Sequence, residues 1–266
     1  MTGKSFVASR GRRALGVIAG VATQALFLVT AWRLFWFLKV GSSAVPAASP
    51  WLAGALSLQF AVPHSLLLWP PVRRRLGRFL SPEFYGLFYC VATCLSLLLL
   101  FRYWPGSTRT LWALEGRPAA LVEWAFAASW IALFYSLHLT GLGHQTGLTP
   151  WWHWLRGRPT PRRGFTPRGA YRYLRHPVYL SFLGLIWFTP RMTADHAILT
   201  VIWTAYLFVG SWLKDERLAF YLGDSYRKYQ EHVSGYPLLP WGPLARRAPS
   251  RPPTEDSVGL PSRQAA

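Results

Sequence analysis

Long apolar runs constrain the fold of this chain more than any other feature. A helix needs about 20 mainly apolar residues to cross the hydrocarbon core of a bilayer. A run at Pro177–Phe188 is shorter and crosses only if its helix begins near Tyr171; otherwise it forms a re-entrant turn. Five other runs approach or exceed the required length: Leu15–Leu38, Trp51–Trp69, Phe84–Phe101, Leu121–Leu142 and Ala197–Leu213. The sequence therefore predicts an all-α integral membrane protein, a bundle of five or six transmembrane helices with a cytoplasmic C-terminal helix.

Basic residues alternate between the loops that join these runs. The net charge of +19 would suggest nucleic-acid binding on a soluble protein. Here apolar runs separate the basic clusters, so we expect the lipid bilayer and no nucleic acid as a partner. The first and third loops are nearly neutral, whereas basic clusters lie at Lys4–Arg13, Arg73–Arg78 and Arg156–Arg175. The positive-inside rule then places both termini in the cytoplasm and favours six spans.

The chain divides into regions of different composition. A helix is expected at Asp215–Val233, with a break at Gly223. The end of the chain is rich in Pro, Ser and Arg with little to bury, which is typical of disorder. We predict a basic cytoplasmic tail at 1–14, four transmembrane helices at 15–143, a loop, helical hairpin and C-terminal helix at 144–240, and a disordered tail at 241–266.

The two cysteines do not indicate a metal or a disulfide. Cys90 and Cys94 lie one helical turn apart within a predicted span, which favours apolar packing. No set of Cys and His has the spacing of a zinc site, so the sequence predicts no metal.

The segment AYRYLRHPVY joins a basic stretch to an apolar helix. Pro177 suits the first helical position, with His176 at the cap. A helix start offers N–H groups to a carboxylate or phosphate. The faces of Tyr171, Tyr173 and Tyr179 attract cations. These properties suit a ligand that is anionic at one end, cationic elsewhere and carries a flat ring, such as S-adenosylmethionine.

Other polar groups near the predicted cytoplasmic face have two interpretations each. Asp215 and Glu216 stand where the last span ends, and they either bind an ammonium group or are solvated. His64 and His138 lie inside predicted spans, where polar groups are costly and often functional, but each also suits a hydrogen bond to a neighbouring helix. Three glycines that permit close approach of a ligand or helix end the fourth span and follow it: Gly141, Gly143 and Gly147.

These motifs together resemble a family. YRYLRHPVY, an apolar hairpin, LGDSYRKY and PLLP are similar to the C-terminal half of the isoprenylcysteine carboxyl methyltransferase and phospholipid methyltransferase superfamily. VPHSLLLWPPVRRRL and TPRMTADHAILTVIWTAYLFVG narrow the resemblance to the bacterial methanethiol S-methyltransferase branch. The resemblance implies an integral membrane enzyme that uses S-adenosylmethionine, in the bacterial inner membrane.

The resemblance also implies which residues contact the cofactor. The family usually has Glu-Glu after the last span, and these positions are Lys214 and Asp215 here, so Asp215 acts alone or Glu216 substitutes. The arginine that prenylcysteine enzymes use aligns near Gly210 and is absent, which weakens a prenylcysteine substrate. The implied cofactor contacts are Arg163, Gly164, Phe165, Thr166, Tyr171, His176, Pro177, Val178 and Tyr179, with Gln145 in addition.

Three functions are consistent with the sequence. The first is S-methylation of a small thiol, methanethiol above all, with His176, His64, His138 or water as the proton acceptor. The second is methylation of a lipid or another membrane-soluble acceptor. The third is a non-catalytic membrane protein.

Overall fold

The computed structural model describes residues 10–41, 50–161 and 165–248. The described part is helical apart from loops and one pair of short strands. In chain order its elements are α1 (Arg10–Val40), α2 (Pro50–Leu68), α3 (Pro70–Leu76), α4 (Pro82–Tyr103), β1 (Thr110–Ala113), α5 (Gly116–Thr140), α6 (Leu142–Gln145), α7 (Leu148–Leu155), the 3₁₀-helix η1 (Gly169–Arg172), α8 (Pro177–Trp187), β2 (Arg191–Thr193), α9 (Ala194–Leu222) and α10 (Asp224–His232).

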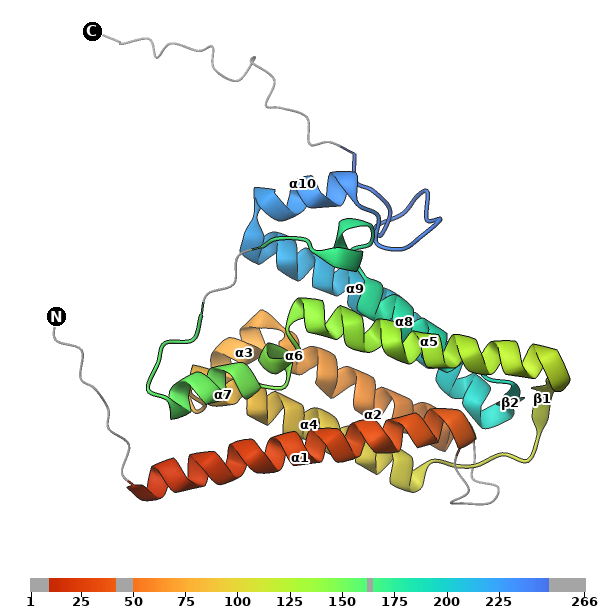
Figure 1. Cartoon of the computed structure of the whole chain (residues 1–266), viewed down its shortest axis with the longest axis horizontal. Helices are drawn as coiled ribbons and strands as arrows, with labels where there is room; N and C mark the ends of the chain where they lie inside the picture. Colours follow the sequence, from red (N-terminus) through yellow and green to blue (C-terminus); the bar gives the residue numbers. More distant parts are fainter. Residues whose placement is uncertain (1–9, 42–49, 162–164, 249–266) are drawn as a thin grey trace, which may run out of the picture.

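The long helices run back and forth as a bundle (Figure 1). In the described residues, five helices are long and apolar enough to cross a membrane: α1, α2, α4, α5 and α9. The apolar helix α8 has 11 residues, which is about 16 Å of length against a hydrocarbon core of about 30 Å. This confirms the all-α membrane fold, with five full-length spans and one short apolar helix between α5 and α9.

The two ends of the bundle differ in structure. At one end, β1 and β2 form a short antiparallel pair, with Trp112 opposite Met192. This pair was not predicted, because neither segment has an alternating apolar pattern long enough to indicate a strand. At the other end lie α3, α7 and the first turn of α1, and Arg13 of α1 donates to the carbonyl of Leu155 at 3.0 Å. The basic clusters that the structure describes therefore lie at one end.

The loop predicted after the fourth span contains helices that pack against α1 and α4. Trp151 of α7 is buried against Gly20 and donates from its indole nitrogen to the carbonyl of Gly16 at 2.8 Å. Gly147 has φ +77, and a Cβ there would overlap the backbone of Gly86 in α4. The expectation that Gly147 allows a close approach is confirmed, and it is a helix that approaches.

The C-terminal region differs from the prediction in two places. The helix α9 continues through Asp215 to Leu222, so the first half of the predicted cytoplasmic helix is an extension of the last span. The predicted break at Gly223 is confirmed, with φ +57. The disordered tail was predicted to begin at residue 241, but Leu244 and Ala245 are buried and packed against the site described below. Residues 1–9 and 249–266 lie outside the described part.

Candidate active site

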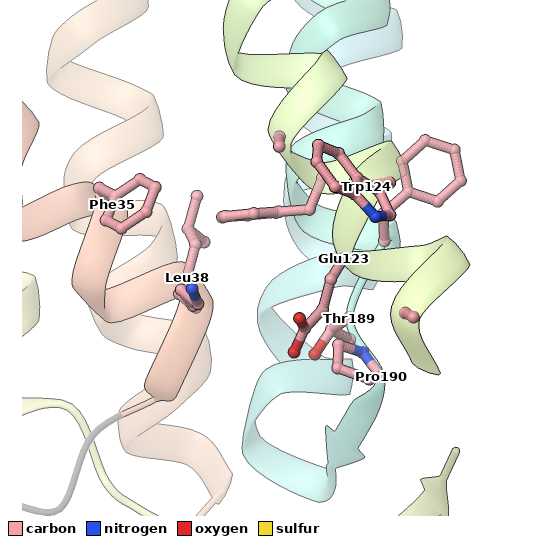
Figure 2. A pocket seen from close by; sticks show the side chains of 11 residues that line it. Phe35, Leu38, Glu123, Trp124, Thr189 and Pro190 are labelled. Carbon is pink, nitrogen blue, oxygen red and sulfur yellow. The ribbon is translucent and has the colours of Figure 1, made fainter. Parts of the chain in front are cut away.

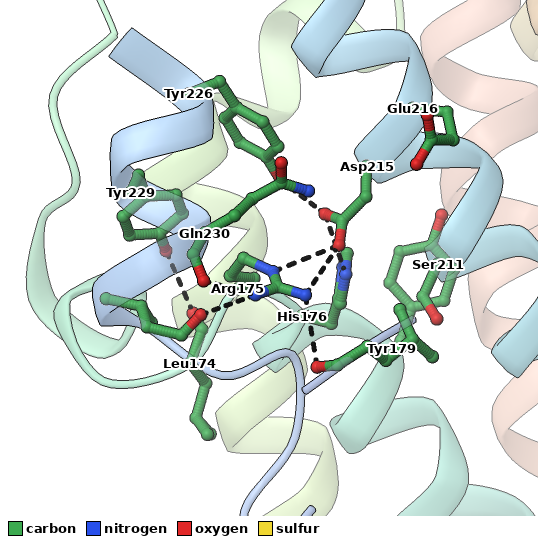
Figure 3. A network of polar contacts seen from close by, with 12 residues as sticks. Leu174, Arg175, His176, Tyr179, Ser211, Asp215, Glu216, Tyr226, Tyr229 and Gln230 are labelled. Atoms are coloured by element: carbon green, nitrogen blue, oxygen red, sulfur yellow. Dashed lines mark hydrogen bonds and ion pairs between the residues drawn. The ribbon is translucent and has the colours of Figure 1, made fainter. Parts of the chain in front are cut away.

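A buried carboxylate on α9 joins three elements next to the start of α8 (Figure 3). Asp215 Oδ2 accepts from Arg175, at 3.1 Å from Nε and 2.9 Å from Nη2. Its Oδ1 accepts from the Tyr226 hydroxyl at 2.5 Å and lies 3.1 Å from His176 Nε2. The side chains of Asp215, Arg175 and His176 are all 0% exposed. The carboxylate is therefore fully engaged by groups of the protein itself.

Arg175 also binds backbone carbonyls near the end of the described chain. Its Nη1 donates to the carbonyls of Val233 at 2.6 Å and Ala245 at 3.1 Å, and its Nη2 donates to Leu244 at 3.1 Å. The amides of Arg175 and His176 donate to the carbonyls of Ser234 and Gly235. We call residues 233–247 the C-terminal strap. The Arg175 guanidinium therefore binds both the Asp215 carboxylate and the backbone carbonyls of the strap.

Burial favours the neutral form of the His176 imidazole, and its neighbours fix the orientation of the ring. Burial lowers the pKa of His176, and the hydrogen bond and charge of Asp215 only partly offset that effect. Nε2 lies 3.1 Å from Asp215 Oδ1, which favours the tautomer that carries its proton on Nε2 and its lone pair on Nδ1. Both ring nitrogens are buried, and among the described residues Nδ1 has no partner at all while Nε2 has only this carboxylate beside it. The ring lies against Tyr179 and Tyr236, with centroid distances of 5.5 and 5.7 Å.

The lowered pKa of His176 predicts a pH-dependent stability. In the unfolded chain, a histidine takes up a proton near its ordinary pKa of 6.5, whereas the buried ring does so at lower pH. The unfolded state then binds more protons, so the free energy of unfolding should fall as the pH drops below about 6.5. Thermal unfolding in detergent, followed across that window, measures this slope. The His176→Gln variant should have a shallower slope, and an unchanged slope would contradict the assignment.

Two tyrosine rings, one of them in contact with His176, lie near the ammonium group of Lys214. Lys214 Nζ lies 5.4 Å from the ring centroid of Tyr179 and 5.9 Å from that of Tyr171. We call Tyr171 and Tyr179 the ring pair. Burial raises the pKa of the Tyr171 hydroxyl, and a hydrogen bond with Thr140 opposes this effect. The predicted Gln145 donates to the same Thr140 hydroxyl at 2.7 Å. Thr140 therefore lies between Gln145 and Tyr171 of the ring pair.

A second polar cluster lies inside the bundle, between α2, α4 and α9. The Tyr89 hydroxyl lies 3.0 Å from Nδ1 and 2.8 Å from Nε2 of His64, and Thr93 lies 3.3 Å from Nδ1. Tyr206 of α9 lies beside His64, with a ring-centroid distance of 6.4 Å. We call His64, Tyr89, Thr93 and Tyr206 the intramembrane cluster. His138 is exposed on α5 and is not part of it.

The structure brings together some of the predicted site residues and separates others. Pro177 begins α8 with His176 at the cap, as predicted, but both are buried, and the strap occupies the amides of residues 175 and 176. Phe165 packs on Tyr226 of α10, and Thr166 is exposed. Val178 packs against the hydrophobic core of the bundle. Arg163 and Gly164 lie outside the described residues.

The acidic pair differs from its prediction. Asp215 has all its contacts inside the protein, so it holds Arg175 and His176 in place and does not offer a free carboxylate to an ammonium group. Glu216 points outward and forms an ion pair with Arg247 of the strap. A buried acid and an exposed acid follow each other because successive residues on a helix face different directions.

Sequence reasoning missed Arg175, Tyr226 and the position of Lys214. Arg175 belongs to the basic cluster Arg156–Arg175, which membrane topology alone explains, and nothing in the sequence separates it from its polar neighbours Arg172 and Tyr173. They are exposed, whereas Arg175 is 2% exposed. The signal that was available is Asp215, since a carboxylate at the end of an apolar helix needs a partner.

Two cavities of the described protein lie away from this cluster. One of about 340 Å³ opens between α1 and α5 near the β1–β2 end, with Phe35, Leu38, Glu123 and Trp124 in its lining (Figure 2). Another of about 430 Å³ borders α3 and α4 and is lined in part by Arg73, Arg74 and Tyr85. Neither lining includes His176 or Asp215, so the polar contacts define the candidate site and the cavities do not.

Comparison with known proteins identifies the family. The chain is 31% identical over 251 residues to methanethiol S-methyltransferase 1 of Bradyrhizobium diazoefficiens, covering 90% of this chain and 87% of the relative. It is 31% identical over 242 residues to methanethiol S-methyltransferase of Mycobacterium tuberculosis, covering 86% of this chain and 98% of the relative. Nurim of Rattus norvegicus is 27% identical over 204 residues, 73% of this chain and 77% of that protein.

Two other comparisons gave no match. No family model and no solved structure matches the chain. The relatives nevertheless cover nearly its full length, and the motifs at His176 and after α9 had already indicated the same branch. The chain belongs to the methanethiol S-methyltransferase family of integral membrane methyltransferases.

Proposed function

We propose that this protein transfers a methyl group from S-adenosylmethionine to a small thiol, with methanethiol as the first candidate and dimethyl sulfide as its product. The observation that carries the proposal is the match to methanethiol S-methyltransferases along 87% and 98% of their lengths. The basic clusters at one end of the bundle support a further part of it, a bacterial inner-membrane location with both termini in the cytoplasm.

The ring pair fits the charged centre of the proposed cofactor. Tyr171 and Tyr179 have a cation, the Lys214 ammonium, within 5.9 and 5.4 Å of their ring centroids. Aromatic faces in a water-poor site attract ammonium and sulfonium groups alike. When bound, S-adenosylmethionine would supply a methyl carbon on positively charged sulfur; a thiolate would attack that carbon in line, and the demethylated cofactor would leave as a neutral thioether. The ring pair would hold the sulfonium, with Val178 and Gln145 beside it.

The remaining residues would orient the thiol and accept its proton. A thiolate is the nucleophile in such a transfer, so a base must take the thiol proton. His176 suits this role at Nδ1, because the Asp215 carboxylate lies 3.1 Å from Nε2 and favours a proton there, and Nδ1 has no partner among the described residues. The same logic operates where an aspartate orients a catalytic histidine. The intramembrane cluster would receive a thiol that arrives through lipid.

The decisive experiment follows the transferred methyl group. Purified protein in lipid nanodiscs, given methyl-labelled S-adenosylmethionine and methanethiol, should release labelled dimethyl sulfide into the headspace. His176→Asn should abolish release, while His138→Asn, a change on the exposed face of α5, should leave it unchanged.

The same experiment separates the alternatives. Label that appears in extracted lipid instead of the headspace would favour a lipid acceptor. A protein whose thermal unfolding does not respond to S-adenosylmethionine, and which releases no product, would contradict the enzyme hypothesis altogether.

A further inference from the structure

Lys214 is a cation in an unusual setting. It stands on α9 between Gly210 and Asp215 and lies over the faces of Tyr171 and Tyr179. Its side chain is partly buried. In the described part of the chain, no carboxylate lies within ion-pair distance of its Nζ. An ammonium group removed from water normally needs a counter-charge, and the rings supply only part of that compensation.

The acids next to Lys214 in sequence form their own pairs and none with its Nζ. Asp215 is occupied by Arg175, His176 and Tyr226. Glu216 is paired with Arg247 on the outside of α9. The nearest further charge on the same helix is Arg217, which is also positive and donates to the carbonyl of Leu68 at 3.5 Å. The surroundings of the ring pair therefore carry an excess of positive charge.

The ring pair cannot hold both an ammonium and a sulfonium, because like charges at that distance repel. S-adenosylmethionine carries two cations, its sulfonium and its α-ammonium, and one anion, its carboxylate. Only the carboxylate can compensate a Lys214 ammonium that the sulfonium displaces from the rings. The sulfonium takes the ring pair, and the flexible side chain of Lys214 turns to the carboxylate a few ångströms away.

We propose that Lys214 is a cofactor-binding residue that pairs with the carboxylate at the amino-acid end of S-adenosylmethionine. The inference rests on the proposed function, since it names how this protein holds that cofactor. In the free protein the Lys214 ammonium lies over both rings of the ring pair. When the cofactor binds, its sulfonium replaces that ammonium over the rings.

A ligand that lacks the carboxylate tests the pairing directly. Affinities of wild-type protein and Lys214→Met for S-adenosylmethionine and for decarboxylated S-adenosylmethionine are measured by calorimetry in detergent. Loss of a charge-assisted contact should weaken S-adenosylmethionine binding by about tenfold or more. Binding of the decarboxylated ligand should be unchanged or tighter, and Lys214→Arg should retain most of the affinity for S-adenosylmethionine.

Lys39→Met is the matched control, because Lys39 also lies over an aromatic ring, 5.9 Å from the centroid of Phe35, and Phe35 and Lys39 belong to the cavity at the other end of the bundle. That variant should bind both ligands as the wild type does. An equal loss for both ligands in Lys214→Met would overturn the inference while leaving the proposed function in place. Wild-type protein that binds neither ligand would instead overturn the proposed function, and the inference with it.

Discussion

Asp215→Ala is expected to lower the free energy of unfolding by about 3–5 kcal/mol, because it leaves a buried arginine without its counter-charge. Arg175 is 2% exposed and has no solvent to turn to. The same change removes the acceptor for the Tyr226 hydroxyl and the partner of His176 Nε2. Thermal or chemical unfolding in detergent measures the effect, with the yield of folded protein as a second readout.

The neighbouring acid provides the control for this prediction. Glu216 also pairs with an arginine, Arg247, but their side chains are 47% and 38% exposed. Exposed ion pairs contribute about 0–1 kcal/mol, so Glu216→Ala should unfold nearly as the wild type does. Similar losses for the two variants would mean that the buried contacts of Asp215 contribute no more than a surface pair.

Tyr179→Leu is expected to weaken binding of S-adenosylmethionine by about tenfold to thirtyfold, because a cation over a desolvated ring gains about 2 kcal/mol. Leucine keeps the apolar contacts of Tyr179 with the core but has no π face. Calorimetry or a thermal-shift titration with the cofactor measures the change. Tyr179→Phe keeps the ring and loses a long hydrogen bond to the carbonyl of Gly210, 3.4 Å, so it should bind almost as well as the wild type.

Tyr173 is the matched control for the position of the ring. It lies within the same motif but is 78% exposed, so Tyr173→Leu should leave cofactor affinity unchanged. If Tyr179→Leu and Tyr173→Leu bind the cofactor equally well, the ring pair is not the cofactor site.

The sequence predicted the fold well because each apolar run is long and separated from the next by polar loops. The predicted runs fall within the helices α1, α2 and α4 to within a residue or two of their ends or inside them, whereas α9 continues nine residues past its predicted end at Leu213. The break at Gly223 was visible because glycine tolerates its backbone conformation. The β1–β2 pair and the helices α6 and α7 were missed. The helix α7 is held in place by Trp151, which packs on α1, and by Gly147, which meets Gly86 of α4, and both contacts join segments that are far apart in sequence. The β1–β2 pair likewise joins segments that are far apart in sequence.

The candidate site was only partly predictable for a related reason. The motif pointed to His176 and Tyr179, and both lie in the site. It could not indicate that Asp215 turns inward while Lys214 turns to the rings, because these neighbours differ only in the face of α9 that each occupies. Nor could it indicate that residues near 244 return to Arg175, since this contact spans 69 residues of chain.

The return of the C-terminal strap to Arg175 has a consequence for biogenesis. Each span can enter the bilayer as it leaves the ribosome, but the guanidinium obtains the carbonyls of Leu244 and Ala245 only after nearly all of the chain has been synthesised. Until that segment docks, the Arg175 guanidinium lacks these acceptors, so we expect the candidate site to be completed only after all the spans have entered the membrane.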